Sequence, residues 1–283
     1  MWGFTGILGK LIHLDAYIIV WHRLLIAVLG LFIVLILLKK GVFPVQTKHF
    51  WKSMGVGVVV ALHWMTFYKS IELSTASLGI LCLSTATLHV TWLGPLLTKQ
   101  RFSWVDFLMG LIVIYGIYFV STDFSESDTV ALKYGLSSAF FAALFSVLNA
   151  SLSKEIEPYK MSLYELLSAF IFLSFCLLFW GEMSFDVFKM TTSDFLWLLF
   201  LGLLCTSFAF LASIEVVKRL GAFTFSLSVN LEPVYTMLLA IVILNEDELL
   251  NRNFYFGSAL IVLVVIGNAL YKSLLKKEPS VGP

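Results

Sequence analysis

Long apolar runs separated by short polar segments dominate the chain. Nine runs are long enough to cross a bilayer, because a spanning helix needs about 20 apolar residues. They cover residues 17–38, 53–71, 76–98, 104–121, 131–153, 161–180, 194–217, 221–244 and 254–273. The longest polar stretch between them is STDFSESDTVALK, residues 121–133. The pattern therefore predicts an all-α membrane protein in which no soluble domain houses the chemistry.

A shorter apolar segment, MWGFTGILGKLI, precedes these nine runs. Gly3, Gly6 and Gly9 recur every three residues, and a smooth face of this kind favours close helix packing. The segment is roughly half a bilayer span in length. We expect it to be the second half of a tenth helix that lacks roughly a dozen residues at its start. A natural half-helix is the alternative.

The two halves of the chain resemble each other, which indicates an internal repeat. FYKSIEL at 67–73 matches FLASIEV at 210–216, an offset of 143 residues. RLLIAVLGL at 23–31 matches ELLSAFIFL at 165–173, an offset of 142. Five helices per repeat is an odd number, so the second repeat enters the membrane from the opposite side. We therefore expect ten transmembrane helices arranged as two inverted five-helix repeats.

The repeat also predicts the domain boundaries. We expect a first repeat, a linker on the outer side, a second repeat and a cytoplasmic tail, at 1–121, 122–130, 131–273 and 274–283. Secondary transporters are built from inverted repeats of this kind, and their substrate site lies near the midplane between the halves.

Composition and charge agree with a membrane class and give the orientation. The chain is 59% hydrophobic and only 13% charged, whereas soluble domains are about 25% charged. With both termini inside, thirteen of the nineteen Lys and Arg residues fall at inner positions and five at outer positions. Because cytoplasmic loops carry the excess of Lys and Arg, the N-terminus and the C-terminus are both expected inside. The net charge of +1 gives no support to a nucleic-acid partner.

Three stretches carry a resemblance to a known family: WGFTGILGK, WHRLLIAVL and NLEPVYTMLLAIVILNE, which ends at Glu246. They resemble the first-helix, second-helix and ninth-helix segments of the drug/metabolite transporter superfamily, and of its EamA-type branch specifically. The resemblance implies a multi-pass carrier of the bacterial inner membrane, often an exporter of amino acids or related metabolites. The chain departs from this branch at Gly94, where relatives often carry Glu before a proline.

The LEP segment holds the sharpest candidate, Glu232. A carboxylate near the bilayer centre costs a few kcal/mol on insertion scales. Pro233 removes a backbone donor in the next position, and Asn230 adds a polar side chain. Together they predict a wet cavity in which Glu232 binds a substrate amine or takes up a proton. The structural alternative is a protonated Glu232 bonded to a neighbouring helix, with Pro233 as a simple kink.

The mirror-related stretch LSTATLHV, 83–90, is unusually polar. An offset of about 146 places Ala86 and Thr87 opposite Glu232 and Pro233. Ser84 and Thr87 share one helix face, and we expect this face to contribute to substrate binding. Hydroxyls in helices also bond back to their own carbonyls, which is the structural alternative. His89 is either a packed neutral side chain or part of a proton relay.

Three further residues are candidate pocket liners: Trp64, Trp2 and Asn149, the last at a mirror position in the sixth helix. Trp64 shares a face with Tyr68, and we expect Tyr68 to act as an interfacial anchor instead.

Arg23 and Glu165 occupy equivalent positions in the two repeats. Arg23 lies about 9 Å from the outer end of its span at 1.5 Å per residue. We expect Arg23 to extend outward and to act in ordering or gating, and Glu165 to reach toward inner lysines.

A secondary transporter explains these features together. The sequence contains no GxxxxGK[ST], HExxH or GxSxG motif, so neither ATP-driven transport nor enzymatic function is expected, and no cofactor. The expected partners are a small-molecule substrate, protons and lipid. A carrier of sugars or nucleotide sugars, and a non-transporting receptor or scramblase, stay open as alternatives.

Overall fold

The computed structural model describes residues 3–41, 46–98, 101–122, 124–209, 212, 232–248 and 250–277. Within these residues the chain is helical. The α-helices are α1 (Phe4–Leu11), α2 (Ala16–Leu37), α3 (Thr47–Leu73), α4 (Ala76–Leu83), α5 (Ala86–Leu97), α6 (Trp104–Val120), α7 (Glu126–Leu152), α8 (Pro158–Trp180), α9 (Thr192–Leu199), α11 (Glu232–Leu244) and α12 (Arg252–Lys277). A π-helix, η2 (Phe200–Phe208), continues α9, and short 3-10 turns form η1 (Phe185–Phe188) and η3 (Glu246–Glu248).

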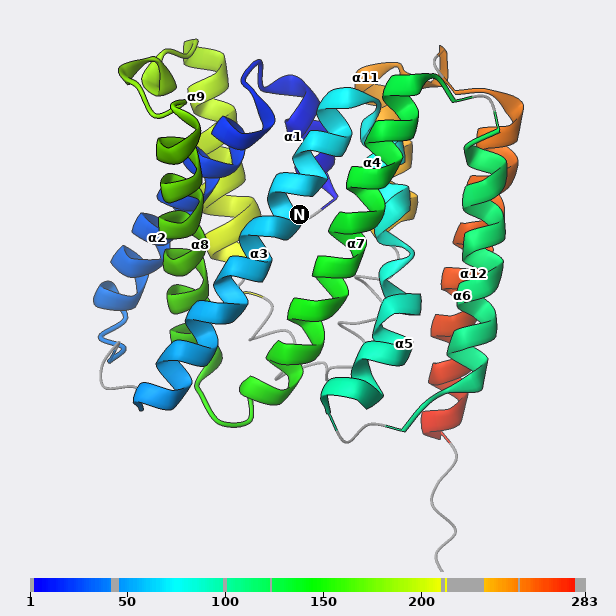
Figure 1. Cartoon of the computed structure of the whole chain (residues 1–283), viewed down its shortest axis with the longest axis horizontal. Helices are drawn as coiled ribbons and strands as arrows, with labels where there is room; N and C mark the ends of the chain where they lie inside the picture. The colour runs from blue at the N-terminus through cyan, green and yellow to red at the C-terminus, as the bar shows by residue number, and fades with distance from the viewer. Residues whose placement is uncertain are drawn as a thin grey trace, which may run out of the picture.

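The long helices run in alternate directions between two ends of the molecule (Figure 1). The connections α1–α2, α3–α4, α6–α7, α8–α9 and α11–α12 meet at the upper end of the view, and α2–α3, α5–α6 and α7–α8 at the lower end. In the described part of the chain, five segments are long and apolar enough to cross a membrane, and four shorter apolar helices accompany them. The predicted all-α membrane architecture is therefore confirmed. The inverted relation of the repeats and the side of the termini stay predictions.

The predicted span 76–98 is not one continuous helix. It divides into α4 and α5, with Ser84 and Thr85 between them. At this break the amides of Ser84 and Thr85 bond three residues back, to Leu81 O and Cys82 O, and the Thr85 hydroxyl also donates to Cys82 O at 2.7 Å. The local backbone therefore tightens to 3-10 geometry, as hydroxyl residues that compete for helix carbonyls allow.

The predicted span 194–217 also differs from a simple helix. It begins as α9 and widens into the π-helix η2 at Phe200. The hydroxyls of Thr206 and Ser207 donate five residues back, to Leu201 O at 2.9 Å and Gly202 O at 3.0 Å. π-helical turns are rare and occur frequently at functional sites.

The linker expected over 122–130 is partly helical, because α7 begins at Glu126. Ser125 starts this helix through a capping box: its hydroxyl accepts from Asp128 N at 3.2 Å, and Asp128 Oδ2 accepts from Ser125 N at 3.2 Å. Reciprocal bonds of this type satisfy two backbone donors that a helix start otherwise leaves open.

The smooth glycine face predicted for the first segment is confirmed. A Cβ at Gly3 would meet Tyr235 and Thr236 of α11, and one at Gly9 would lie 3.1 Å from the ring of Tyr68 in α3. The absence of side chains at these positions lets α1 pack between α4, α11 and the C-terminal part of α3, in the upper half of the molecule (Figure 1).

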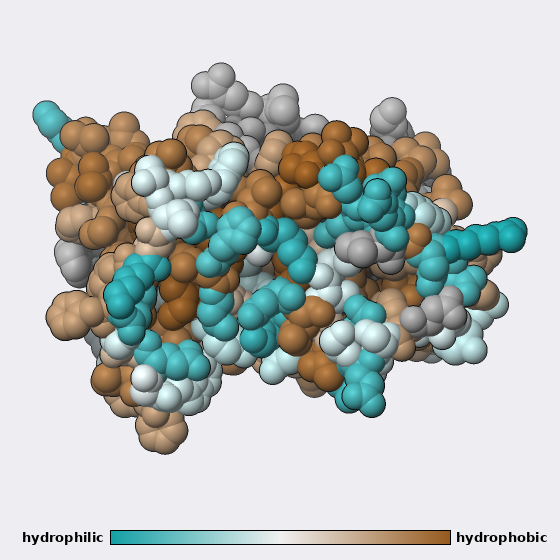
Figure 2. Space-filling model, turned by 90° about the horizontal axis from the view of Figure 1, so that it is seen from above, coloured by the Kyte–Doolittle hydropathy of each residue, from teal (hydrophilic) through white to brown (hydrophobic). Residues whose placement is uncertain are grey.

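The surface matches a protein that faces lipid around its sides. Large apolar side chains are strongly exposed on the outer helices, for example Leu37 at 74% and Val242 at 76%. Exposure on this scale would be an aggregation hazard in water, whereas lipid chains cover it in a bilayer. Seen from above, hydrophilic residues gather on part of the upper face and hydrophobic residues surround them (Figure 2).

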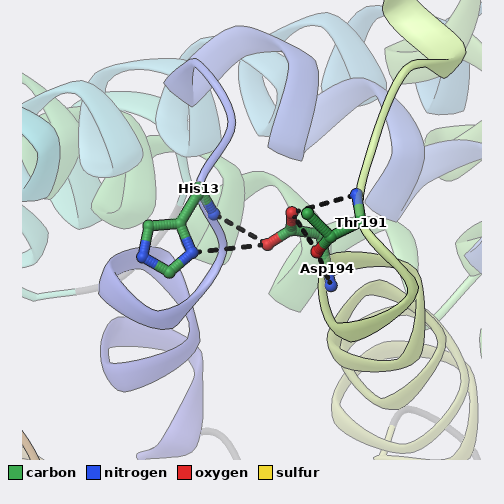
Figure 3. A network of polar contacts seen from close by, with 3 residues as sticks. All are labelled: His13, Thr191 and Asp194. Carbon is green, nitrogen blue, oxygen red and sulfur yellow. Dashed lines mark hydrogen bonds and ion pairs between the residues drawn. The ribbon is translucent and has the colours of Figure 1, made fainter.

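Buried carboxylates hold the upper end together. Asp194, 2% exposed, accepts from His13 N at 2.9 Å and from the Thr191 hydroxyl at 2.7 Å (Figure 3). Glu246, also 2% exposed, accepts from Ala76 N at 2.7 Å and Ser77 N at 3.0 Å. Each carboxylate lies in the second half of the chain and binds main-chain donors of the first half, so both contacts join the two halves at this end.

Candidate functional site

Arg23 of α2 is the centre of a buried polar cluster. Its side chain is 4% exposed, and the guanidinium lies 3.8 Å above the ring of Trp64. The Nε group donates to the Thr206 hydroxyl at 3.0 Å and an Nη group donates to the Tyr68 hydroxyl at 3.3 Å. The expectation that Arg23 extends outward is therefore wrong: cation–π stacking and two hydrogen bonds stabilise its charge inside the protein.

Close packing of α2 against η2 brings Thr206 to Arg23. A Cβ at Gly202 would meet the side chain of Ile26 and would lie 3.3 Å from the Arg23 carbonyl. The Ser207 hydroxyl donates to Ala27 O at 2.9 Å and joins the two helices directly. A larger residue at position 202 would separate the helices and remove the support of the guanidinium.

Tyr68 is part of this cluster and is not an interfacial anchor. It is 1% exposed, and its hydroxyl donates to Thr5 O at 3.3 Å while it accepts from Arg23. Because Thr5 belongs to α1, the Tyr68 hydroxyl connects the first helix to the guanidinium through α3. The predicted pairing of Trp64 and Tyr68 on one helix face is confirmed, and both rings lie beside Arg23.

Glu232 begins α11 and carries the charge opposite to that of Arg23. The side chain is partly buried. α11 packs against α1, because a Cβ at Gly3 would meet Tyr235, one turn beyond Glu232. The Tyr68 hydroxyl, which accepts from Arg23, donates to Thr5 O, also of α1. The Arg23 cluster and α11 therefore both lie against α1.

Three of the predicted site residues cannot be placed in full. Trp2 and Asn230 lie outside the described residues, and for Pro233 only the backbone, in the first turn of α11, is described. Their expected roles stay predictions.

The hydroxyl groups in the polar stretch of the fourth span differ in whether they have a hydrogen-bond partner. The hydroxyls of Thr87 and Thr91 donate to Ser84 O and Thr87 O at 3.0 Å each, as expected for hydroxyls that bond back within a helix. Ser84 is different, because its Oγ atom is buried and has no hydrogen-bond partner at the break between α4 and α5.

His89 lies apart from Arg23, in a separate pocket between α5, α6 and α7. This pocket has a volume of about 520 Å³. It is lined by Thr85, Leu88, His89, Ile114, Ile117, Leu136, Ser137, Phe140 and Phe141. The His89 ring packs edge-on against Phe140, with 5.7 Å between ring centroids. The lining is mostly apolar, so this pocket differs in chemistry from the Arg23 cluster.

Asn149 also lies away from Arg23, in contact with Glu165. The Asn149 Nδ2 group donates to Glu165 Oε2 at 3.0 Å, and Glu165 is 3% exposed. The expectation that Glu165 reaches inner lysines is wrong, because Lys160 pairs with Glu157 and Lys52 with Glu155.

The structure therefore brings Arg23 and Trp64 into contact and places Glu232 on α11, which shares the neighbour α1 with them, whereas Thr87, His89 and Asn149 make their contacts elsewhere. Thr206 completes the support of Arg23 and was missed, since a threonine in an apolar run gives no sequence signal. No group of three or more His, Cys, Asp or Glu side chains that would hold a metal ion occurs in the described part of the chain.

Comparison with known proteins agrees with this architecture. The sequence profile of the EamA-like transporter family matches residues 1–122 and 129–270, so the chain belongs to this family of multi-pass membrane transporters. A curated relative, "Uncharacterized transporter YetK" of Bacillus subtilis (strain 168), is 24% identical in an alignment that covers 99% of this chain and 86% of that protein. A solved structure described as "Crystal structure of protein" matches with a TM-score of 0.67 at 13% identity, covering 98% of this chain and 95% of that chain. This last match concerns the fold alone.

Proposed function

We propose that the protein is a secondary transporter that exports an amino acid, or a related zwitterion, across the bacterial inner membrane by alternating access. The observation that carries the proposal is the buried, supported guanidinium of Arg23, together with a carboxyl, Glu232, on a helix that packs against the same helix α1. An amino acid offers a carboxylate that matches the guanidinium and an ammonium group that matches the carboxyl. The substrate thus offers a partner to each of the two charges.

The support around Arg23 fits a binding role. Trp64, Tyr68 and Thr206 hold the guanidinium from different helices, so its orientation is fixed before a ligand arrives. A pre-organised charge loses little conformational entropy on binding, which raises affinity. The break between α4 and α5 adds further support, because discontinuous helices form the substrate sites of many secondary transporters.

The distribution of basic residues supports the orientation. Lys39 and Lys40 follow α2, and Lys154 follows α7, all at the lower end of Figure 1. With two inverted repeats and this end in the cytoplasm, the chain obeys the positive-inside rule. The absence of an ATP-binding motif in the sequence favours an ion gradient, such as protons, as the energy source.

Counterflow in proteoliposomes tests the proposal. We expect the protein to exchange one or a few labelled amino acids, and we expect N-acetylated or amidated forms of the same compounds to compete weakly. Glu232→Gln should reduce the preference for a free amine, and Arg23→Gln the preference for a free carboxylate. Each loss should be at least about thirtyfold, since removing one partner of a buried charge pair costs about 2 kcal/mol or more.

Glu248→Gln is the matched control, because Glu248 is an exposed carboxyl just beyond α11. Arg23→Lys keeps the charge and shows whether loss of function reflects misfolding. Exchange of sugars or nucleosides but of no amino acid, by a folded sample, would refute the zwitterion proposal. Failure to exchange any solute would refute transport itself and favour a receptor or a scramblase.

A further inference from the structure

The contact between Asn149 and Glu165 leaves two buried oxygen atoms without a donor. The amide nitrogen of Asn149 donates to Glu165 Oε2 at 3.0 Å. Glu165 Oε1 and Asn149 Oδ1 are both buried and lack a hydrogen-bond partner. An ionised carboxylate and an amide oxygen are acceptors only, so neither atom can satisfy the other.

Protonation of Glu165 would supply the missing hydrogen-bond donor. If Glu165 carries a proton on Oε1, that oxygen becomes a donor, and Asn149 Oδ1 is an available acceptor. The acid and the amide then exchange two hydrogen bonds, and no polar atom of the pair lacks a partner. We propose that Glu165 and Asn149 form a proton-binding site, with Glu165 as the group that takes up the proton and Asn149 as its positioning residue.

Among the described residues, no cation pairs with Glu165. On α8 itself, Lys160 pairs with Glu157 at 2.6 Å, and Tyr164 packs against Phe50. On α3, His49 and Lys52 pair with Glu155, and His63 contacts Ser138. On α2, His22 contacts Ile18 O and Arg23 contacts Thr206. Lys48 at the start of α3 and Lys154 after α7 are exposed. The hydrogen bond from Asn149 is therefore the polar contact of this carboxyl in the described part of the chain.

Glu165 lies where α8 packs closely against α3. A Cβ at Gly57 would meet the backbone of Glu165 and the side chain of Ser168, and Ser168 donates to Met54 O at 2.6 Å. α3 therefore packs tightly against the backbone of α8 at Glu165. Glu165 lies seven residues from the start of α8, about 10 Å at 1.5 Å per residue. The short route to water runs to the lower end, along the α7–α8 connection.

The proton site itself is inferred from the geometry of Glu165 and Asn149, whereas its role in coupling rests on the proposed transport function. A proton bound at Glu165 is separate from the substrate groups around Arg23, so Glu232 need not serve as both amine ligand and proton carrier. Buried carboxyls in membrane helices mark proton relays in many pumps and transporters.

Infrared spectroscopy of the protein in lipid, without substrate, tests the site directly. We expect a carbonyl stretch from a protonated carboxylic acid that Glu165→Gln removes and Asn149→Ala shifts in frequency and in its pH of appearance. Glu155→Gln is the control, because this exposed carboxyl lies on the adjacent connection, and the band should persist. A spectrum in which Glu165→Gln removes no protonated-acid band from pH 5 to pH 8 would overturn the proposal.

Transport supplies the second readout. Glu165→Gln should abolish accumulation driven by a pH gradient, so that the solute only equilibrates, whereas counterflow without a gradient should continue. Unchanged gradient-driven accumulation in Glu165→Gln would overturn the coupling role, and so would transport driven by sodium in place of protons. If wild-type protein shows no counterflow at all, the transport proposal fails, and the infrared result still decides whether the proton site exists.

Discussion

Glu246 provides the sharpest test of how the upper end is held together. Its carboxylate accepts from Ala76 N and Ser77 N, the first two amides of α4. Thr75 serves the following donors: its hydroxyl accepts from Leu78 N at 3.0 Å and its carbonyl from Gly79 N at 3.2 Å. The amides of Ala76, Ser77 and Leu78, which have no intrahelical partner, are thus satisfied, and Gly79 N makes the first regular bond of the helix.

Truncation of this side chain should be costly. Hydrogen bonds to a charged group contribute about 1.5–3 kcal/mol each, and an unsatisfied buried amide costs about 1–3 kcal/mol. Ala76 and Ser77 are both 0% exposed, so solvent does not reach these amides in the folded state. Because the two bonds share one carboxylate, their effects do not simply add, and we expect Glu246→Ala to lower the free energy of unfolding by about 3–5 kcal/mol. Glu246→Gln keeps one acceptor and should lose about half as much.

Reversible unfolding in mixed micelles, followed by tryptophan fluorescence, measures the loss. Asp247→Ala is the matched control, since Asp247 is the exposed neighbour in the same turn. A loss below about 1 kcal/mol for Glu246→Ala, which is the size expected for a surface ion pair, would refute the reasoning. It would mean that water replaces the carboxylate on α4.

Three further predictions concern single side chains. Thr206→Val should lower the free energy of unfolding by about 1.5–3 kcal/mol in the same assay, because it removes the acceptor of Arg23 Nε, and Thr206→Ser should restore it. Ser125→Ala should cost about 1 kcal/mol by removing the cap of α7, and a loss near zero would contradict the capping role. The hydrogen bond from Lys52 holds the pKa of Glu155 below its ordinary value of 4.5, so the pair stabilises the fold above this pH and the contribution disappears as the pH falls through the depressed pKa. The difference in Tm between wild type and Glu155→Gln should therefore vanish under strong acid, and a difference that grows on acidification would contradict the assignment.

The helices themselves could be predicted from hydropathy, because a bilayer demands long apolar segments. Predicted boundaries such as 17–38 and 104–121 agree closely with α2 and α6. Breaks inside apolar runs could not be predicted in the same way. The break between α4 and α5 and the π-helix η2 depend on hydroxyl groups that compete for backbone carbonyls. Hydropathy values contain no information about that competition.

The residues of the candidate site also fall into those that could be predicted from the sequence and those that could not. Glu232 was detectable because a carboxylate in an apolar run is costly, and Trp64 because it shares a helix face with Tyr68. The burial of Arg23 was not detectable, since its depth along the helix gives no information about the partners that neighbouring helices supply. Glu165 was misjudged for the same reason: proximity to a helix end predicts solvent contact only if no other helix covers that end.

The contacts of Asp194 and Glu246 determine which of the contacting positions can change during sequence divergence. Both carboxylates bind main-chain amides, of His13 in one case and of Ala76 and Ser77 in the other. Every amino acid except proline offers that same amide. The exposed position 13 is therefore free to drift through most substitutions without loss of the contact. Positions 76 and 77 are fully buried and accept only small residues, and the two acids are fixed. Sequence variation among relatives should therefore be unequal at the contact of Asp194, with a fixed acid facing a changeable loop position 13 that excludes only proline.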